Sequence, residues 1–325
     1  MKYKYLFGPV PSRRLGISLG IDLLRDKICS FNCIYCECGR TSRQTMTRDE
    51  FVPTADVITE INDYLKNFDM PDYITFSGSG EPTLHSGIGE IVEHIKSINP
   101  EIKVALLTNA TLLSDPKVRE EISKIDVVLP TINGISAESV KRISRPLGNF
   151  DSEKIIEGLI SLRKEIKNSK ASTTKQTIWL AYFAVEGINT SEEELALAKE
   201  AILQIMPDRV QLNTLDRPAA ESWVKPSSKE TLEKIIEFWN LIDEHGIPVE
   251  IVSKYRSRRE IRSYKIDIEH SILSTISRRP CTLEDISDSL MLHISEVTKY
   301  IDVLEKEKKI KLQIEDRGVF YTKTH

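Results

Sequence analysis

Three cysteines in the segment CSFNCIYCECG are the residues of this chain whose types and spacing best suit chemistry. Cys29, Cys33 and Cys36 follow the pattern CxxxCxxC. Three thiolates are one short of a closed zinc or iron–sulfur site, and this spacing is not the usual pairing of zinc-finger ligands. A cubane held by three cysteines leaves one iron open to a small molecule. The pattern therefore predicts a reactive 4Fe-4S cluster. A structural zinc knuckle, or cysteines that pack in a core, is the alternative.

A second motif, FSGSGEPTL, spans residues 76–84 and follows a predicted strand. Its glycines allow the backbone to approach a ligand closely, and Glu81 lies in the same loop. A glycine-rich turn with an exposed glutamate is the alternative. A phosphate-binding loop is not favoured, because no lysine follows as it does in a P-loop.

Polar residues also follow later predicted strands. Asn109 ends LLTNATLL, and an amide there can both donate to and accept from ribose hydroxyls, although asparagine after a strand is also a common turn former. Arg145 and Arg217 each precede a proline and could reach an anionic substrate group, with ordinary ion pairing as the alternative. The remaining strand-end candidates are Thr131, Asn133, Gly187 and Asn189.

The elements that must position these residues form an alternating pattern of strands and helices. Strand, helix and strand at this rhythm imply parallel pairing through right-handed crossovers, hence an α/β fold built as an open, partial (β/α)6 barrel. Loops after the strands then gather at one mouth, where barrel chemistry sits. Thr54 and Ser191 are expected to cap helices. We expect strands at 17–22, 73–77, 103–108, 127–130, 177–184 and 209–214, and helices at 55–68, 88–98, 115–122, 151–167 and 192–205.

Composition fits a cytoplasmic enzyme. The 325 residues suggest about two domains, and 40% hydrophobic with 29% charged residues is ordinary for a soluble protein. The net charge of -4 gives no global attraction to nucleic acid or acidic membranes. No apolar run resembles a signal peptide or a membrane span. Of five cysteines, four crowd into residues 29–38, which is a poor disulfide framework and implies a reducing compartment.

Together, the cysteine motif, the GEP sequence and the strand-end asparagine resemble the radical S-adenosylmethionine (SAM) superfamily, over about residues 7–252. The resemblance implies that the open iron binds SAM and that one electron cleaves it to methionine and a 5′-deoxyadenosyl radical. It also implies that Ser79, Gly80 and Glu81 hold the SAM amino group and that Asn109 binds ribose. Tyr35 would lie near adenine, Thr131 and Asn133 near the cofactor, and Gly187 and Asn189 on the adenine side.

Within that superfamily, the segments FGPVPSRRLG and CIYCECGRT resemble a group of Fe-S oxidoreductases related to the wyosine tRNA-modification synthases. Only 28 residues precede Cys29, which leaves no room for a second N-terminal cysteine cluster. The resemblance implies a one-electron reductant of the flavodoxin or ferredoxin type and a macromolecular substrate, tRNA or a peptide. We expect one cluster only, because Cys38 and Cys281 cannot supply an auxiliary one. Cys38 is a radical-quenching thiol or a bystander, and Cys281 is expected to be buried.

The pattern changes after residue 252, so we divide the chain into a barrel (1–252), a linker (253–265) and a C-terminal domain (266–325). The linker holds six basic residues and one acid, which suits phosphate contacts, a solvated linker or pairing with acids of the barrel. Helices at 268–277, 282–290 and 295–306 and a hairpin at 310–314 and 319–321 predict a winged helix, with Ser295 as a cap. Arg13 and Arg14 are expected to be structural.

Two classes of function follow. One is a radical SAM enzyme that abstracts hydrogen from a macromolecular substrate. The other is a SAM- or redox-responsive Fe-S regulator that binds DNA through the third helix of the winged helix. Residues 266–325 hold nine basic residues against eleven acids, and the third helix carries four acids: Glu296, Asp302, Glu305 and Glu307. This acidic helix and the full set of cofactor motifs favour the enzyme.

Overall fold

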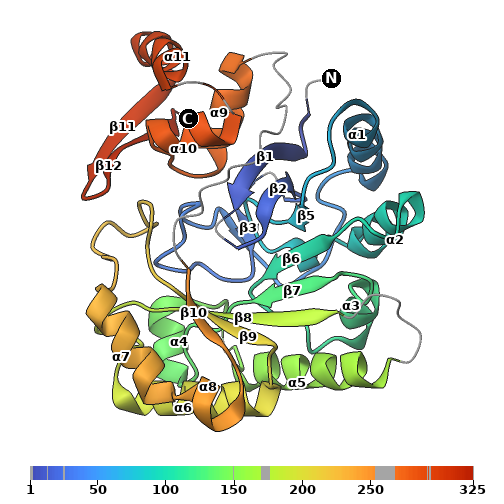
Figure 1. Ribbon diagram of the computed structural model, residues 1–325, viewed down its shortest axis with the longest axis vertical. Helices are drawn as coiled ribbons and strands as arrows, with labels where there is room; N and C mark the ends of the chain where they lie inside the picture. Colours follow the sequence, from blue (N-terminus) through green and yellow to red (C-terminus); the bar gives the residue numbers. More distant parts are fainter. Residues whose placement is uncertain are drawn as a thin grey trace.

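A parallel sheet in sequence order forms the centre of the protein. The computed structural model describes residues 3–12, 14–24, 26–148, 150–169, 176–252, 268–290, 292 and 294–324. The sheet confirms the predicted α/β class and the partial-barrel arrangement (Figure 1). Its six central strands run parallel to one another: β2 (Gly16–Ile21), β5 (Tyr73–Phe76), β6 (Val104–Thr108), β7 (Val127–Pro130), β8 (Thr177–Phe183) and β9 (Arg209–Asn213).

Two further strands, which the sequence pattern did not predict, extend this sheet at its edges. β1 (Leu6–Ser12) pairs antiparallel with β2, and β10 (Val249–Ile251) pairs parallel with β9. The prolines at positions 9 and 11 argue against a strand in sequence, but an edge strand tolerates them because one side of it needs no ladder hydrogen bonds. β10 has only three residues, too few to show a period.

At least one helix lies between consecutive central strands of the chain, and these helices cover the sheet (Figure 1). Ser191 caps α6 as predicted, since its side chain accepts a hydrogen bond from the backbone N–H of Glu194. The Thr54 prediction was wrong, because α1 begins at Thr54 and Pro53 occupies the cap position. No helix in the described ranges is long and apolar enough to cross a membrane. The helices are α1 (Thr54–Asn67), α2 (Ile88–Ile98), α3 (Pro116–Glu121), α4 (Ala137–Ile143), α5 (Glu153–Asn168), α6 (Glu192–Ile205), α7 (Lys229–Trp239) and α8 (Leu241–His245).

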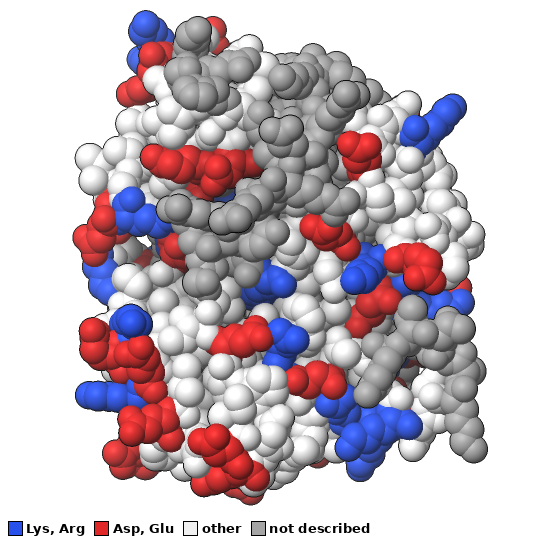
Figure 2. Space-filling model, in the orientation of Figure 1, with Lys and Arg blue, Asp and Glu red and all other residues white. Residues whose placement is uncertain are grey.

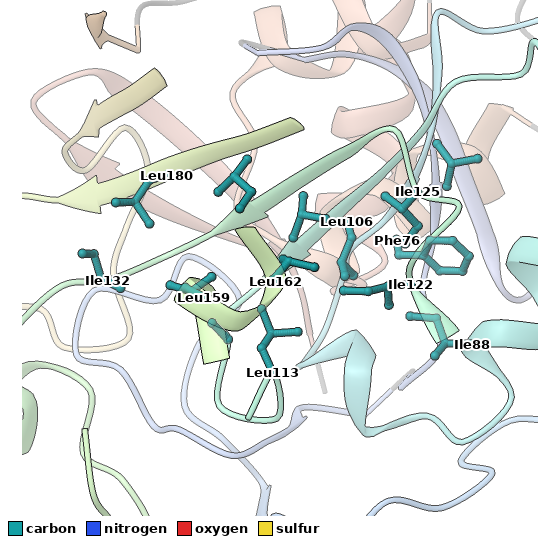
Figure 3. Close-up of a cluster of buried hydrophobic side chains, with 14 of the residues drawn as sticks. Phe76, Ile88, Leu106, Leu113, Ile122, Ile125, Ile132, Leu159, Leu162 and Leu180 are labelled. Carbon is teal, nitrogen blue, oxygen red and sulfur yellow. The ribbon is translucent and has the colours of Figure 1, made fainter. Parts of the chain in front are cut away.

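The core lies between the sheet and its covering helices. Phe76, Leu106 and Leu180 on the strands meet Ile88 on α2 and Leu159 on α5, all fully buried (Figure 3). Full burial of each such side chain contributes roughly 1.5–3 kcal/mol. This packing holds the carboxyl ends of the strands in fixed relative positions, so the loops that follow them meet at one mouth.

The C-terminal residues form a separate apolar core beside β1 (Figure 1). Three helices and a hairpin follow in the predicted order: α9 (Ile268–Arg278), α10 (Leu283–Leu290), α11 (Ile294–Lys306), β11 (Ile310–Glu315) and β12 (Gly318–Lys323). α11 begins one residue before Ser295, so the predicted cap is wrong. The winged-helix class and the domain boundaries stay predictions. Arg13 and the basic linker at 253–265 lie outside the described residues, while Arg14 donates to Asn213 Oδ1 at 3.4 Å.

Candidate functional site

The cysteine loop starts at a short strand that the glycine-rich loop supports. β3 (Ile28–Cys29) pairs with β4 (Arg43–Gln44) and brings Cys29 to the mouth beside β2. Gly80 packs directly under β3, where an added Cβ would lie 1.8 Å from the carbonyl oxygen of Ile28. Only glycine permits this approach. The backbone of the cysteine loop and that of the 78–81 loop therefore touch, whereas the sequence predicted that these glycines allow close approach to a ligand.

The three cysteine thiols are close enough to influence one another electrostatically, and a lysine that the sequence analysis missed lies beside Cys36. Lys27 Nζ is 2.8 Å from Cys36 Sγ. Hydrogen bonding from Cys38 and the nearby lysine charge lower the pKa of Cys36 to about 5. Burial raises the pKa of Cys29 to about 11, and burial followed by the charges of Cys29 and Cys36 raises that of Cys33. Lys27 lies two residues before Cys29, and a charged residue there has no recognisable pattern in a single sequence.

The donor set fits an iron–sulfur cluster. Cysteine thiolates are the usual ligands of such clusters, and the cysteines bind separate irons. In the described part of the chain, no three His, Cys, Asp or Glu side chains are placed to share one metal ion. The Sγ of Cys38 lies 3.3 Å from the carbonyl oxygen of Gly78, so this thiol faces the glycine-rich loop. Cys281 is buried, as predicted.

Glu81 is buried at the mouth, and the chain's own groups occupy its carboxylate. Oε1 accepts from the hydroxyls of Thr83 and Thr108 at 2.6 and 2.7 Å and from the Thr83 N–H at 3.1 Å. Oε2 accepts from the Asn109 N–H at 2.6 Å. Burial raises the pKa of this carboxyl. Glu81 therefore ties the glycine-rich loop to the end of β6, and the exposed-glutamate alternative is wrong.

Asn109 points toward the cysteine loop. Its Nδ2 donates to Ser30 Oγ at 2.8 Å and lies 3.5 Å from Cys29 Sγ. Its Oδ1 accepts from the N–H and the hydroxyl of Thr111. Ser79, on the neighbouring loop, donates to Asp22 Oδ2 at 2.6 Å. The structure thus brings Cys29, Ser79, Glu81 and Asn109 to the same part of the mouth.

The candidates on the β7–β9 side bond mainly to each other. Tyr35 stacks on Phe183 with ring centroids 4.0 Å apart, and its hydroxyl accepts a short hydrogen bond from Asn133 Nδ2. Asn189 is fully buried: its Nδ2 donates to the carbonyl oxygens of Asn133 and Phe183, and its Oδ1 accepts from the Val185 N–H. These contacts form a packed polar cluster beneath the later strand ends.

The two remaining candidates, Thr131 and Gly187, lie at the edge of this cluster. Thr131 follows β7 and donates its N–H to the Thr108 carbonyl at 2.9 Å, which joins two neighbouring strand ends. Gly187 is exposed with φ +74°, a left-handed conformation that favours glycine, and nothing lies within 4 Å of an added Cβ. Gly187 thus shapes a turn and does not closely approach another group.

The two arginines proposed for anion binding are ion-paired. Arg145 bonds to Glu221, which also pairs with Arg40 of the cysteine loop. Arg217 lies 3.2 Å from Glu37 and 3.7 Å from Asp285 of the C-terminal helix α10. Both arginines therefore form ion pairs, which was the alternative to anion binding in the sequence analysis.

Comparison with known proteins identifies the relatives of this chain. A family model described as "Radical SAM superfamily" matches residues 27–197. The UPF0026 protein of Methanocaldococcus jannaschii is 32% identical over 98% of this chain and 95% of its own length. A protein of Brachyspira hyodysenteriae named GTPase Obg is 32% identical over 97% of this chain, which spans only 44% of that protein.

A solved structure shares the fold. The crystal structure of Streptococcus suis SuiB bound to S-adenosylmethionine matches 72% of this chain and 50% of that chain, with a TM-score of 0.53. The two sequences are 12% identical, so this likeness concerns the fold alone.

Proposed function

The chain belongs to the radical SAM superfamily and is an enzyme of that kind, and from this premise we propose that it binds one 4Fe-4S cluster through Cys29, Cys33 and Cys36. When bound, the cluster would supply the electron that cleaves SAM to methionine and a 5′-deoxyadenosyl radical for hydrogen abstraction. The observation that carries the proposal is the backbone contact at Gly80, which joins the cysteine loop to the 78–81 loop.

We assign distinct roles to the residues around the mouth. Ser79 and Gly80 offer backbone groups beside the cysteines, and Asn109 offers an amide already aimed at Cys29 and Ser30. Glu81 acts on SAM chiefly by holding this loop and the end of β6 in place, because four hydrogen bonds from the chain already fill its carboxylate. Tyr35, Thr131, Asn133, Gly187 and Asn189 form the opposite wall.

The substrate that we propose is macromolecular, either tRNA or a peptide, with electrons from a flavodoxin- or ferredoxin-type reductant in the cytoplasm. A small module with its own core beside the mouth supports recruitment of a large substrate. DNA binding by a regulator finds less support. Figure 2 shows acidic and basic side chains interspersed over the described part of one face, and α11 carries Asp302 and Glu305.

Anaerobic reconstitution of the full chain tests this proposal. We expect about four irons and four sulfides per chain. Changing Cys29, Cys33 or Cys36 to Ala should abolish iron binding, whereas Cys38→Ala, the matched control in the same loop, should retain it. With a strong one-electron reductant, the wild-type protein should release methionine and 5′-deoxyadenosine from SAM. One zinc and no sulfide in anaerobically purified protein would contradict the proposal.

A further inference from the structure

Lys27 lies at the start of the cysteine loop, on a backbone that is held in place. Its carbonyl oxygen accepts hydrogen bonds from the Ser42 N–H at 2.9 Å, the Ser42 hydroxyl at 3.0 Å and the Arg43 N–H at 3.3 Å. The next residue, Ile28, contacts Gly80 of the glycine-rich loop. The backbone at Lys27 is therefore fixed from two sides, by the chain around β4 and by the glycine-rich loop.

The side chain of Lys27 extends to the last cysteine of the motif. Its Nζ is 2.8 Å from the Sγ of Cys36, nine residues later. The backbone of Cys36 is also held, because its N–H donates to the Cys33 carbonyl at 3.2 Å and its carbonyl accepts from the Gly39 N–H at 3.0 Å. Lys27 thus donates a hydrogen bond to one of the three cysteines that we propose as cluster ligands.

No carboxylate in the described ranges forms an ion pair with Lys27. The residue is half-buried, where a charge acts more strongly on its neighbours than it does in open solvent. Within the same ranges, no other lysine or arginine donates a hydrogen bond to Cys29, Cys33 or Cys36. Asn109, which lies 3.5 Å from Cys29 Sγ, is a neutral donor. Lys27 therefore brings both a hydrogen bond and a positive charge to the cysteine motif.

We propose that Lys27 raises the reduction potential of the cluster through its hydrogen bond and its charge at Cys36. This inference rests on the cluster binding proposed above. On reduction, one electron passes from the reductant to the cluster, no bond forms or breaks, and the negative charge beside the thiolates grows by one. Hydrogen bonds to the sulfurs and nearby positive charge stabilise this more negative state, and both set the potentials of iron–sulfur clusters. Lys27 acts through Cys36 and is not itself a ligand.

A redox titration of the reconstituted full chain, followed by the electron paramagnetic resonance signal of the reduced cluster, tests the proposal. Lys27→Met removes the charge and the donor but keeps a long side chain. We expect the ratio of reduced to oxidised cluster at a fixed potential to fall at least about tenfold, which is about 59 mV for a one-electron couple. Lys27→Arg keeps the charge and the donors and should restore most of this loss.

The matched control is Lys124→Met, which removes the same charge at a distant position. Lys124 is more than half exposed, pairs with Glu93 and precedes β7, at the end of the sheet away from the mouth. We expect its reduction potential to equal that of the wild-type protein. An equal shift in Lys124→Met and Lys27→Met would overturn the proposal, because the effect would then come from net charge alone.

Iron and sulfide analysis of every variant separates the two levels of the argument. Absence of iron and sulfide from the wild-type protein would contradict the proposed function. A Lys27→Met variant with a full cluster and an unchanged potential would overturn only the role of Lys27. If Lys27→Met takes up no iron, Lys27→Gln, which keeps a neutral donor, replaces it and should show a smaller shift in the same direction. Loss of iron in both variants would assign Lys27 to cluster assembly and overturn the inference.

Discussion

On the β2–β6 side of the mouth, polar groups and glycines join loops from different strands around the cysteines, whereas on the β7–β9 side the polar side chains are bonded among themselves. Gly80 touches the backbone of Ile28, and Asn109 points at Cys29. Across the mouth, Asn133 and Asn189 bond to each other and to β8. The first arrangement depends on close approach between the backbones of two loops. The second depends on hydrogen bonds among the polar groups of the cluster itself. The two sides should therefore respond differently to the same kind of substitution.

The largest expected effect comes from Gly80→Ala. The added Cβ would lie 1.8 Å from the carbonyl oxygen of Ile28, and because this is backbone, β3 must move. We expect the variant to lose most of its reconstituted iron. Gly187→Ala is the matched control on the other side: it has open space, so it should retain iron and lose only about 1 kcal/mol of stability through its positive φ. Iron analysis and thermal unfolding measure both, and equal iron content in the two variants would contradict the contrast.

An intermediate effect is expected from Glu81→Ala. Removal of the carboxylate leaves buried donors of Thr83, Thr108 and Asn109 without an acceptor and frees the end of β6. We expect SAM affinity to fall about ten- to a hundredfold while iron is retained, since loss of one such interaction costs roughly 1.5–3 kcal/mol. The control is Glu194→Ala, a buried glutamate that bonds to the Ile135 and Ser136 N–H groups on the β7–β8 side. If calorimetry shows that Glu81→Ala and Glu194→Ala lose SAM affinity equally, the expected difference between the two sides of the mouth is contradicted.

The smallest effect on cofactor binding should come from Asn189→Ala. This change leaves the Val185 N–H and the carbonyl oxygens of Asn133 and Phe183 unsatisfied in a fully buried position. We expect a loss of about 2–4 kcal/mol in the free energy of unfolding, with SAM affinity of the folded protein nearly unchanged. Denaturant titration and calorimetry measure the two quantities. A tenfold loss of SAM affinity without loss of stability would instead make Asn189 a direct cofactor contact.

Local patterns made much of the fold and the first side of the mouth predictable. The cysteine spacing and the glycine-rich loop each lie within a few consecutive residues. Each strand is likewise recognised from its own short segment. β1 was missed because its prolines oppose a strand unless that strand lies at an edge. Glycine at position 80 was predicted to allow close approach to a ligand, whereas in the structure it allows close approach to β3.

The partners of polar side chains were not predictable, because they depend on contacts between distant residues. An asparagine after a strand has the same local signal whether it faces a cofactor or a neighbouring carbonyl. Asn109 and Asn189 illustrate the two cases, since one points at the cysteines and the other is fully buried. Likewise, Arg217 and Asp285 are paired across the two modules. A single sequence contains no sign of that pairing.

The packing of α9 and α10 against β1 has a consequence for the solubility of the protein. An open sheet exposes unpaired N–H and C=O groups at its outer strand, which is a template for pairing with another chain. Here the C-terminal helices pack against that strand, and the prolines at positions 9 and 11 remove two of its donors. A shortened protein that lacks these helices would present an uncovered strand edge. Its aggregation would then report on edge protection and not on catalysis.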